Sequence, residues 1–225
     1  MGTPPREQGS VHPRGTEKIG APRIPSLVHS SKMAHSLDDQ EKLILRALVR
    51  DPRDSDNAIG LTTGVNVRTV SRKRQRMEED GILSYYTQIN LGANGTGQYP
   101  VRQLYTIKFK LGVTYQRLLD DIRREPNVRT VFTECIVESH IAEIDGHLAM
   151  LLVVEGESDL KLVQTVHEKI IPSLRLNHGE DCISEIQTVR LLAPVRVMRN
   201  YILPVNMQNG YLAKEWPDDA IYVGR

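Results

Sequence analysis

The sequence predicts an α+β protein with an N-terminal helix-turn-helix domain, winged-helix-like, and a C-terminal ferredoxin-like dimerisation domain. Two observations lead to this fold class. The first half of the chain shows the order helix, polar turn, helix, glycine turn and helix, which is the order of a helix-turn-helix. From about Val101 the apolar period changes, and the elements follow as β-α-β-β-α-β, the order of a ferredoxin-like antiparallel sheet.

Five segments follow from this organisation. Residues 1–35 are rich in Pro, Gly, Ser and Arg and lack an apolar period, so we expect a flexible tail. The helix-turn-helix domain is predicted over 36–91 and a glycine-rich hinge over 92–101. The ferredoxin-like domain is predicted over 102–195. A C-terminal extension, 196–225, either adds an edge strand and an arm that docks on a neighbouring subunit or is a loosely ordered tail.

The composition limits the classes of partner. The formal charge is only +1, so any affinity for nucleic acid must come from a local basic patch. Cys135 and Cys182 lie far apart on predicted strands, and we expect buried, reduced thiols. No apolar run approaches membrane-spanning length, and the start lacks the layout of a signal peptide. We therefore expect a cytoplasmic protein without a membrane partner.

The first two helices have recognisable ends. The pattern predicts a helix over Leu37–Arg50, capped by Ser36 and ended by Asp51-Pro52, because proline disfavours helix at the residue before it. A second helix is predicted over Ser55–Thr63. Within it, Gly60 is expected where two helices touch closely. These two helices precede the glycine turn at Gly64-Val65.

The stretch Asn66–Arg76 is the predicted recognition helix. It carries five basic residues, yet Val67, Val70 and Met77 form an apolar stripe at helical spacing. Asn66 is a favourable N-cap. A basic, hydroxyl-bearing outer face on a capped third helix is suited to a DNA major groove. A strand leaving this unit is expected over Ile82–Asn90.

We assign roles to the outer face from the chemistry of DNA. Arg68 and Arg72 are expected to read guanine and Thr69 to meet thymine methyl groups, whereas Ser71, Lys73 and Arg76 would hold phosphates. With the capping residue, the candidate DNA-binding residues are Asn66, Arg68, Thr69, Ser71, Arg72, Lys73 and Arg76.

The second half predicts a sheet with both helices on one face. The expected strands are Tyr105–Leu111, Val128–Glu138, Leu148–Glu155 and Cys182–Leu192, and the expected helices run over Tyr115–Ile122 and from Ser158 to a stop at Pro172. The sheet face without helices is bare, and such a face commonly packs against a second copy. A homodimer is therefore the expected minimum.

Several stretches, in register, resemble the Lrp/AsnC family of feast/famine transcription regulators over residues 37 to about 192. They are the phrase Leu37-Asp38-x-x-Glu41-x-x-Ile44-Leu45, the step Asp51-x-Arg53, the turn and helix Gly64–Lys73, and the exit Met77–Leu83. The resemblance implies a dimeric or octameric regulator that binds double-stranded DNA and senses a small molecule, often an amino acid. It implies no catalytic residue, metal or cofactor.

The effector site implied by the resemblance is Asp145, Gly146 and His147, near the start of the third strand. Three departures from the family pattern stand out. The stretch between Val128 and Gly146 is about ten residues longer than usual, which implies an extended hairpin or a changed dimer surface. Arg74 occupies a position that is usually aliphatic. After Gly146 the family tends to place acidic residues, where this chain has His147-Leu148-Ala149.

Two other functions are alternatives to this prediction. Proteins of similar architecture act as sirohaem decarboxylases, and His140, His147 and His167 are the groups that such an enzyme would offer. They lack metal-ligand spacing, no nucleophile–base pair is visible, and the basic helix would have no purpose, so we predict that the protein is not an enzyme. The other alternative is an architectural, DNA-wrapping protein without sequence specificity.

Overall fold

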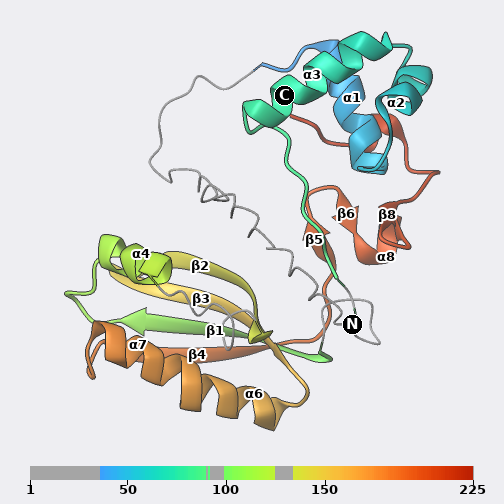
Figure 1. The fold of residues 1–225 in the computed structure, drawn as a ribbon. Coiled ribbons are helices and arrows are strands. Elements are labelled where there is room, and N and C mark those ends of the chain that lie inside the picture. Colours follow the sequence, from blue (N-terminus) through green and yellow to red (C-terminus); the bar gives the residue numbers. More distant parts are fainter. Residues whose placement is uncertain (1–35, 90, 92–98, 125–133, 225) are drawn as a thin grey trace, which may run out of the picture. The chain divides into compact units, whose positions relative to one another are not determined.

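The computed structural model describes residues 36–89, 91, 99–124 and 134–224 (Figure 1). The predicted tail over 1–35 and most of the predicted hinge over 92–101 lie outside these residues.

Three helices in the order predicted from the sequence form the N-terminal part. They are α1 (Asp39–Arg50), α2 (Asp56–Thr63) and α3 (Val67–Glu79), and each contacts the other two. The apolar side chains that they and the turn before α3 bury are Ile44, Leu45, Ala47, Leu48, Ile59, Val65, Val70 and Met77. The predicted cap of the first helix was wrong: Asp38, not Ser36, accepts from the Glu41 amide, and the Glu41 carboxylate accepts from the Asp38 amide in return. This reciprocal pair satisfies two amides at once.

Gly60 and Gly64 hold α2 and α3 close together. A Cβ added to Gly60 would lie 3.0 Å from the Val65 carbonyl oxygen and 3.0 Å from Val67 Cγ2, so the predicted close approach is confirmed. Gly64 has φ 73°, the left-handed conformation that ends α2. A side chain at Gly60 would therefore press against the start of α3, whereas one at Gly64 would have open space and be disfavoured only by the left-handed backbone.

The exit from α3 differs from the prediction. The helix ends in a Schellman motif, in which Ile82 N donates to Met77 O (2.8 Å) and Gly81 N to Glu78 O (3.1 Å). The strand expected over Ile82–Asn90 is not found in the described residues 82–89, which lack the hydrogen-bond pattern of a strand.

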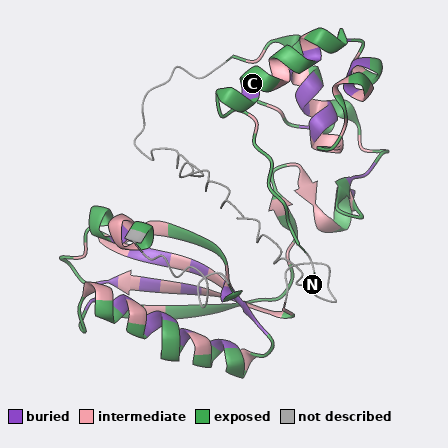
Figure 2. Ribbon diagram, viewed as in Figure 1, coloured by how far each residue is buried: buried purple, intermediate pink, exposed green. Residues whose placement is uncertain are grey.

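The C-terminal half contains a four-stranded antiparallel sheet with the order β2-β3-β1-β4, which confirms the ferredoxin-like prediction (Figure 1). Its strands are β1 (Val101–Phe109), β2 (Ile136–Ile144), β3 (His147–Gly156) and β4 (Ile183–Leu191). Burial alternates along β1, and Figure 2 shows this alternation in colour. The alternation means that one face is covered and the other is not.

Helices cover one face of this sheet. They are α4 (Tyr115–Arg124), α6 (Asp159–Thr165), a π-helical turn η1 (Val166–Ile170) and α7 (Ile171–His178). The core between helices and sheet consists of Tyr105, Ile107, Phe109, Leu118, Cys135, Met150, Leu152, Val154, Leu162, Val166, Ile170, Ile171, Leu174 and Cys182. Both cysteines are buried and neither forms a disulfide within the described residues, as predicted. No helix among the described residues is long and apolar enough to cross a membrane.

The expected stop at Pro172 was wrong. Ser158 caps the helix as predicted, but the helical path continues through η1 into α7, where Pro172 lies in the first turn. Proline lacks the amide that an α-helical interior needs, and the wider π turn before it changes which amides must be paired. Along this path Leu162, Val166 and Ile170 face the core, whereas Leu160 is exposed.

The described part of the C-terminal extension forms a small substructure of its own. It contains the strand pairs β5–β6 (Arg196–Met198, Tyr201–Ile202) and β7–β8 (Met207–Gln208, Tyr211–Leu212), the short helix α8 (Leu203–Asn206) and the 3-10 turn η2 (Asp218–Ala220). The expected edge strand was wrong, because β5 and β6 pair with each other and not with the four-stranded sheet. β8 instead contacts α1 of the same chain.

Candidate nucleic-acid interface

The N-terminus of α3 is set by a side-chain cap. Asn66 Oδ1 accepts from the Arg68 amide at 3.0 Å, so the predicted N-cap is confirmed. The cap fixes the first turn of the helix, from which Arg68 and Thr69 project.

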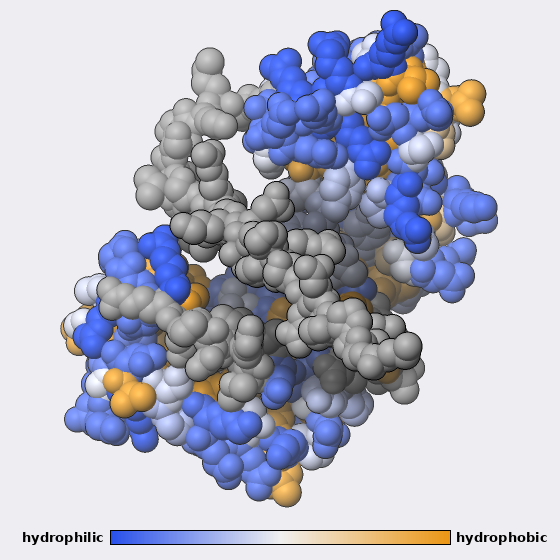
Figure 3. Space-filling view, in the orientation of Figure 1, coloured by the Kyte–Doolittle hydropathy of each residue, from blue (hydrophilic) through white to orange (hydrophobic). Residues whose placement is uncertain are grey.

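The outer side of α3 carries the side chains that remain exposed. Arg68 and Arg72 are exposed, and neither guanidinium makes a hydrogen bond or ion pair with another residue of the described chain. Ser71 is exposed and Thr69 is half-buried. Arg76 is 64% exposed and approaches Asp80 one turn later, at 3.6 Å. Figure 3 shows mainly hydrophilic surface over the three helices.

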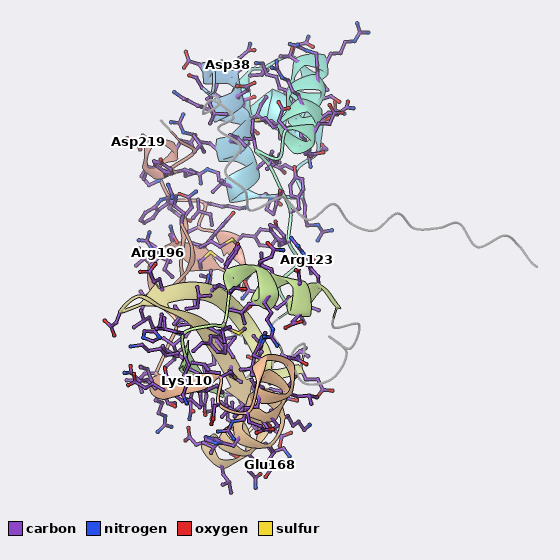
Figure 4. All side chains as sticks on the ribbon, turned by 90° about the vertical axis from the view of Figure 1, so that its left-hand side faces the viewer. Asp38, Lys110, Arg123, Glu168, Arg196 and Asp219 are labelled. Carbon is purple, nitrogen blue, oxygen red and sulfur yellow. The ribbon has the colours of Figure 1, made fainter. Side chains whose placement is uncertain are left out.

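Lys73 lies on the inner side of the same helix. Its ammonium pairs with Asp38 and lies 3.6 Å from Glu41 Oε1, and its side chain is only 11% exposed. Hydrogen bonding from Lys73 lowers the pKa of Asp38. Lys73 therefore links α3 to the capping box of α1, whose first residue Asp38 is labelled in Figure 4. This position does not suit the phosphate contact expected for Lys73.

Arg74 is the second inward cation. Its Nε donates to Tyr85 Oη (2.9 Å), and its Nη1 donates to Asp54 O (3.0 Å) and Asp56 Oδ1 (3.2 Å). Nε also lies 3.3 Å from Glu78 Oε1, and the guanidinium lies over the Tyr85 ring. A single side chain thus connects the start of α2, the body of α3 and the segment after α3.

The predicted effector residues form the tight turn between β2 and β3. Asp145 and Gly146 both have positive φ, 51° and 75°. Lys108 pairs with Asp145 at 2.8 Å and lowers the pKa of its carboxyl, and His147 Nδ1 lies 2.9 Å from the Phe109 carbonyl oxygen. These contacts hold the hairpin in register with β1, so the polar groups of the turn already have partners within the protein.

The three histidines of the enzyme alternative do not come together as a metal site. His140 Nε2 lies 2.7 Å from Glu138 Oε1 on β2, His147 follows the β2–β3 turn, and His167 is exposed on η1. Among the described residues no group of His, Cys, Asp and Glu side chains is arranged to hold a metal ion.

The three-helix unit and the β2-β3-β1-β4 sheet together define the fold of the Lrp/AsnC transcription regulators, as the resemblance in sequence implied. Solved structures that are similar include Escherichia coli AsnC, with 19% identity over 73% of this chain and 97% of that chain and a TM-score of 0.50. The leucine response regulatory protein LrpA of Mycobacterium tuberculosis has 17% identity over 74% and 99%, with a TM-score of 0.51.

A third similar structure is the transcriptional regulator NMB0573 of Neisseria meningitidis, solved in complex with L-Met. It has 15% identity over 76% of this chain and 98% of that chain, with a TM-score of 0.50. No protein-family model and no curated protein matches the sequence. At these identities the likeness establishes the fold, and the function rests on the residues described above.

Proposed function

We propose that this protein is a transcription regulator of the Lrp/AsnC type that binds specific sites on double-stranded DNA as a dimer or a higher oligomer. The observation that carries this proposal is the pair of arginines, Arg68 and Arg72, on the outer side of a capped third helix. Both are exposed and unpaired within the described residues, whereas Lys73 and Arg74 of the same helix are engaged in ion pairs. Free guanidinium groups one turn apart are suited to the guanines of a major groove.

The remaining outer residues complete the proposed contact surface. Thr69, which is half-buried, would meet a thymine methyl group, and Ser71 and Arg76 would bind phosphates. Asn66 contributes as the cap of the helix. Lys73 leaves the proposed contact set, because its ammonium is already paired with Asp38.

The uncovered face of the sheet supports a homodimer. Leu104 of β1 pairs in register with Val153 of β3 and Val189 of β4, so the three side chains form an apolar row across three strands. Val189 is 52% exposed. A second copy would remove this row from water, and a two-fold dimer would present two recognition helices to a palindromic site. An octamer of such dimers is a prediction from the resemblance, and light scattering would test it.

The effector prediction stays a prediction. Because Lys108 and the Phe109 carbonyl already occupy the polar groups of Asp145 and His147, a ligand there would compete with contacts within the chain. A thermal-shift panel of the amino acids, including the L-methionine bound by the Neisseria protein, tests whether any of them raises the melting temperature.

The central experiment is selection of bound DNA from a random duplex library, followed by measurement of the affinity ratio between the selected site and random DNA. We expect a ratio of at least about 10³ at physiological salt. The control variant is Arg123→Ala, on α4 (labelled in Figure 4), which removes an exposed arginine outside the helix-turn-helix.

Two outcomes would contradict the proposal in different ways. Tight binding with a ratio near one would instead support an architectural, DNA-wrapping role. Absence of DNA binding together with a Soret band after addition of a tetrapyrrole would support the sirohaem-decarboxylase alternative.

A further inference from the structure

The C-terminal extension is anchored to α1 through Arg50, the last residue of that helix. Arg50 Nε and Nη2 donate to Asp218 Oδ1 at 2.8 and 2.6 Å. Nη1 donates to the carbonyl oxygens of Ala213 (3.3 Å) and Lys214 (3.1 Å), and Nη2 donates to that of Trp216. The segment from Ala213 to Asp218 therefore curves around one guanidinium group. The five N–H donors of arginine lie in a fixed fork, and this curved segment matches that fork.

A second contact binds the extension to the same end of α1. Tyr201 Oη donates to the Val49 carbonyl oxygen at 2.7 Å. The last carbonyls of a helix have no partner within the helix, so this hydroxyl satisfies a group that α1 leaves open. Leu212 of β8, the strand that contacts α1, is only 4% exposed. The contact thus combines apolar burial with polar groups that are paired.

Hydrogen bonds within the extension hold its parts together. Asn206 is 2% exposed; its side chain accepts from Ile202 N and donates to Asn200 O, both at 2.8 Å. Asn200 in turn exchanges two hydrogen bonds with the backbone of Tyr222, each 2.9 Å long. These two asparagines connect the start, the middle and the end of the extension.

The extension is also close in sequence to the sheet. β4 ends at Leu191, and the Val195 carbonyl already accepts from Leu203 N at 2.9 Å. Only Leu192, Ala193 and Pro194 lie between the sheet and the braced substructure, so the link reaches roughly 10–14 Å at most. The chain thus joins the helix-turn-helix to the sheet twice, once through residues 80–100 and once through the docked extension.

We propose that the C-terminal extension is an intrachain strap that limits the movement of the DNA-reading helices relative to the sheet. The Arg50–Asp218 contact is its fastening. Resting on the proposed function, the inference extends to DNA: a strap that restricts two reading units in a dimer lowers the entropy cost of engaging both half-sites together. It has little effect on one unit binding one half-site.

The fastening is tested with full-length variants. Asp218→Asn and Arg50→Lys should both weaken it, the first because the charge of the acceptor is lost and the second because an ammonium cannot reproduce the guanidinium fork. Asp219→Asn is the matched control, since it removes a neighbouring negative charge (Asp219 is labelled in Figure 4) and Asp219 makes no hydrogen bond or ion pair with another described residue. Hydrogen exchange should become faster at residues 211–221 and at the end of α1 in the first two variants only. Unchanged exchange there would overturn the fastening.

The restraint is tested without DNA by measuring the distance between two nitroxide labels in one chain. The labels are attached at Leu61→Cys on α2 and Glu168→Cys on η1, both exposed positions. Dilution with unlabelled protein suppresses distances between copies. Burial raises the pKa of the native Cys135 and Cys182 thiols, so these label slowly. We expect a narrow interspin distance distribution that broadens with Asp218→Asn and not with Asp219→Asn. An equally broad distribution in all three proteins would overturn the restraint.

Measurements of DNA affinity then distinguish a failure of this inference from a failure of the proposed function. Asp218→Asn should weaken binding to a two-half-site duplex about five- to twentyfold and change affinity for a single half-site less than twofold. Equal losses on both duplexes would mean a purely structural role and overturn the strap. Absence of specific binding by the wild-type protein would contradict the proposed function, and the label distances would still decide whether the strap exists.

Discussion

The two sides of α3 contain the same residue types and have different surroundings. On the outer side, Arg68 and Arg72 are exposed and make no ion pair with the described chain. On the inner side, Lys73 pairs with the capping box of α1, and Arg74 bonds to α2 and to Tyr85. The difference shows that a count of basic residues overstates the surface available to DNA.

The physical reason is the pitch of the helix. Each residue turns about 100° around the axis, so Arg74 lies about 40° from the buried Val70 and Arg72 about 160° from it. A cation near the buried stripe either finds acceptors or destabilises the packing. Here the acceptors come from α1, from α2 and from the segment that follows α3.

The largest expected effect is on the outer side. Arg72→Ala should weaken binding to the selected site by about 1–3 kcal/mol and reduce discrimination against base changes, because one arginine–guanine contact is lost. The thermal stability should hardly change, since the side chain is exposed. Fluorescence anisotropy on selected and single-base-changed duplexes measures both quantities. An unchanged affinity and footprint would remove Arg72 from the interface.

The next largest expected effect is on stability, at the inner side of α3. Arg74→Leu should lower the free energy of unfolding by about 1–2 kcal/mol, because hydrogen bonds to Asp54, Asp56 and Tyr85 are lost while the aliphatic stem is kept. Urea denaturation measures this loss. Gln75→Leu, an exposed neighbour, is the control. If Arg74→Leu instead reduced DNA affinity at full stability, Arg74 would belong to the outer side.

The variants Lys73→Ala and Arg76→Ala should differ in how strongly their DNA affinity depends on salt. Arg76→Ala should reduce the slope of log affinity against log salt by about one, the amount expected for one lost phosphate contact. Lys73→Ala should leave the slope unchanged and lower stability by roughly 0.5 kcal/mol, the size of a partly exposed ion pair. Equal slopes for the two variants would restore Lys73 to the phosphate-binding set.

The smallest expected effect is a pH dependence of the stability that the Lys73–Asp38 pair contributes on the inner side of α3. The pKa of Asp38 is lowered from 3.8 in the folded protein, chiefly by hydrogen bonding from Lys73. The contribution of this carboxylate is therefore complete above about pH 3.8 and is lost as the pH falls through the lower, folded-state pKa. Urea midpoints of wild type and Lys73→Ala should differ at pH 7, and the difference should shrink as the pH falls below 3.8 through the folded-state pKa of Asp38. A difference that stays constant as the pH falls through the acid range would mean that Lys73 acts through packing.

Much of the fold was predictable because its signals are local. Turn residues and apolar periods predicted three helices, the capping role of Asn66, the close approach at Gly60 and the β-α-β-β-α-β order. The predictions that were wrong concern positions where a distant contact or a neighbouring side chain decided the local structure. Asp38 replaced Ser36 as a cap because Glu41 completes a reciprocal pair, and Pro172 did not end its helix because a π turn precedes it.

The sequence predicted the candidate side chains of α3 but did not separate those that stay free from those that are paired within the protein. Arg74 could have been assigned inward, since it lies four residues after Val70 and three before Met77. Its acceptors Asp54 and Asp56 and the partner of Lys73, Asp38, carry no local signal that links them to α3. The same holds for Arg50 and Asp218, which are far apart in the chain.

The sequence by itself determined the three helices of the N-terminal part and the β-α-β-β-α-β order, because those choices depend mostly on residues within one or two turns of each other. Only the tertiary structure decided which cations of α3 remain free and where the C-terminal extension docks. Both outcomes depend on hydrogen-bond acceptors from distant parts of the chain. The local sequence pattern around each cation does not indicate these acceptors.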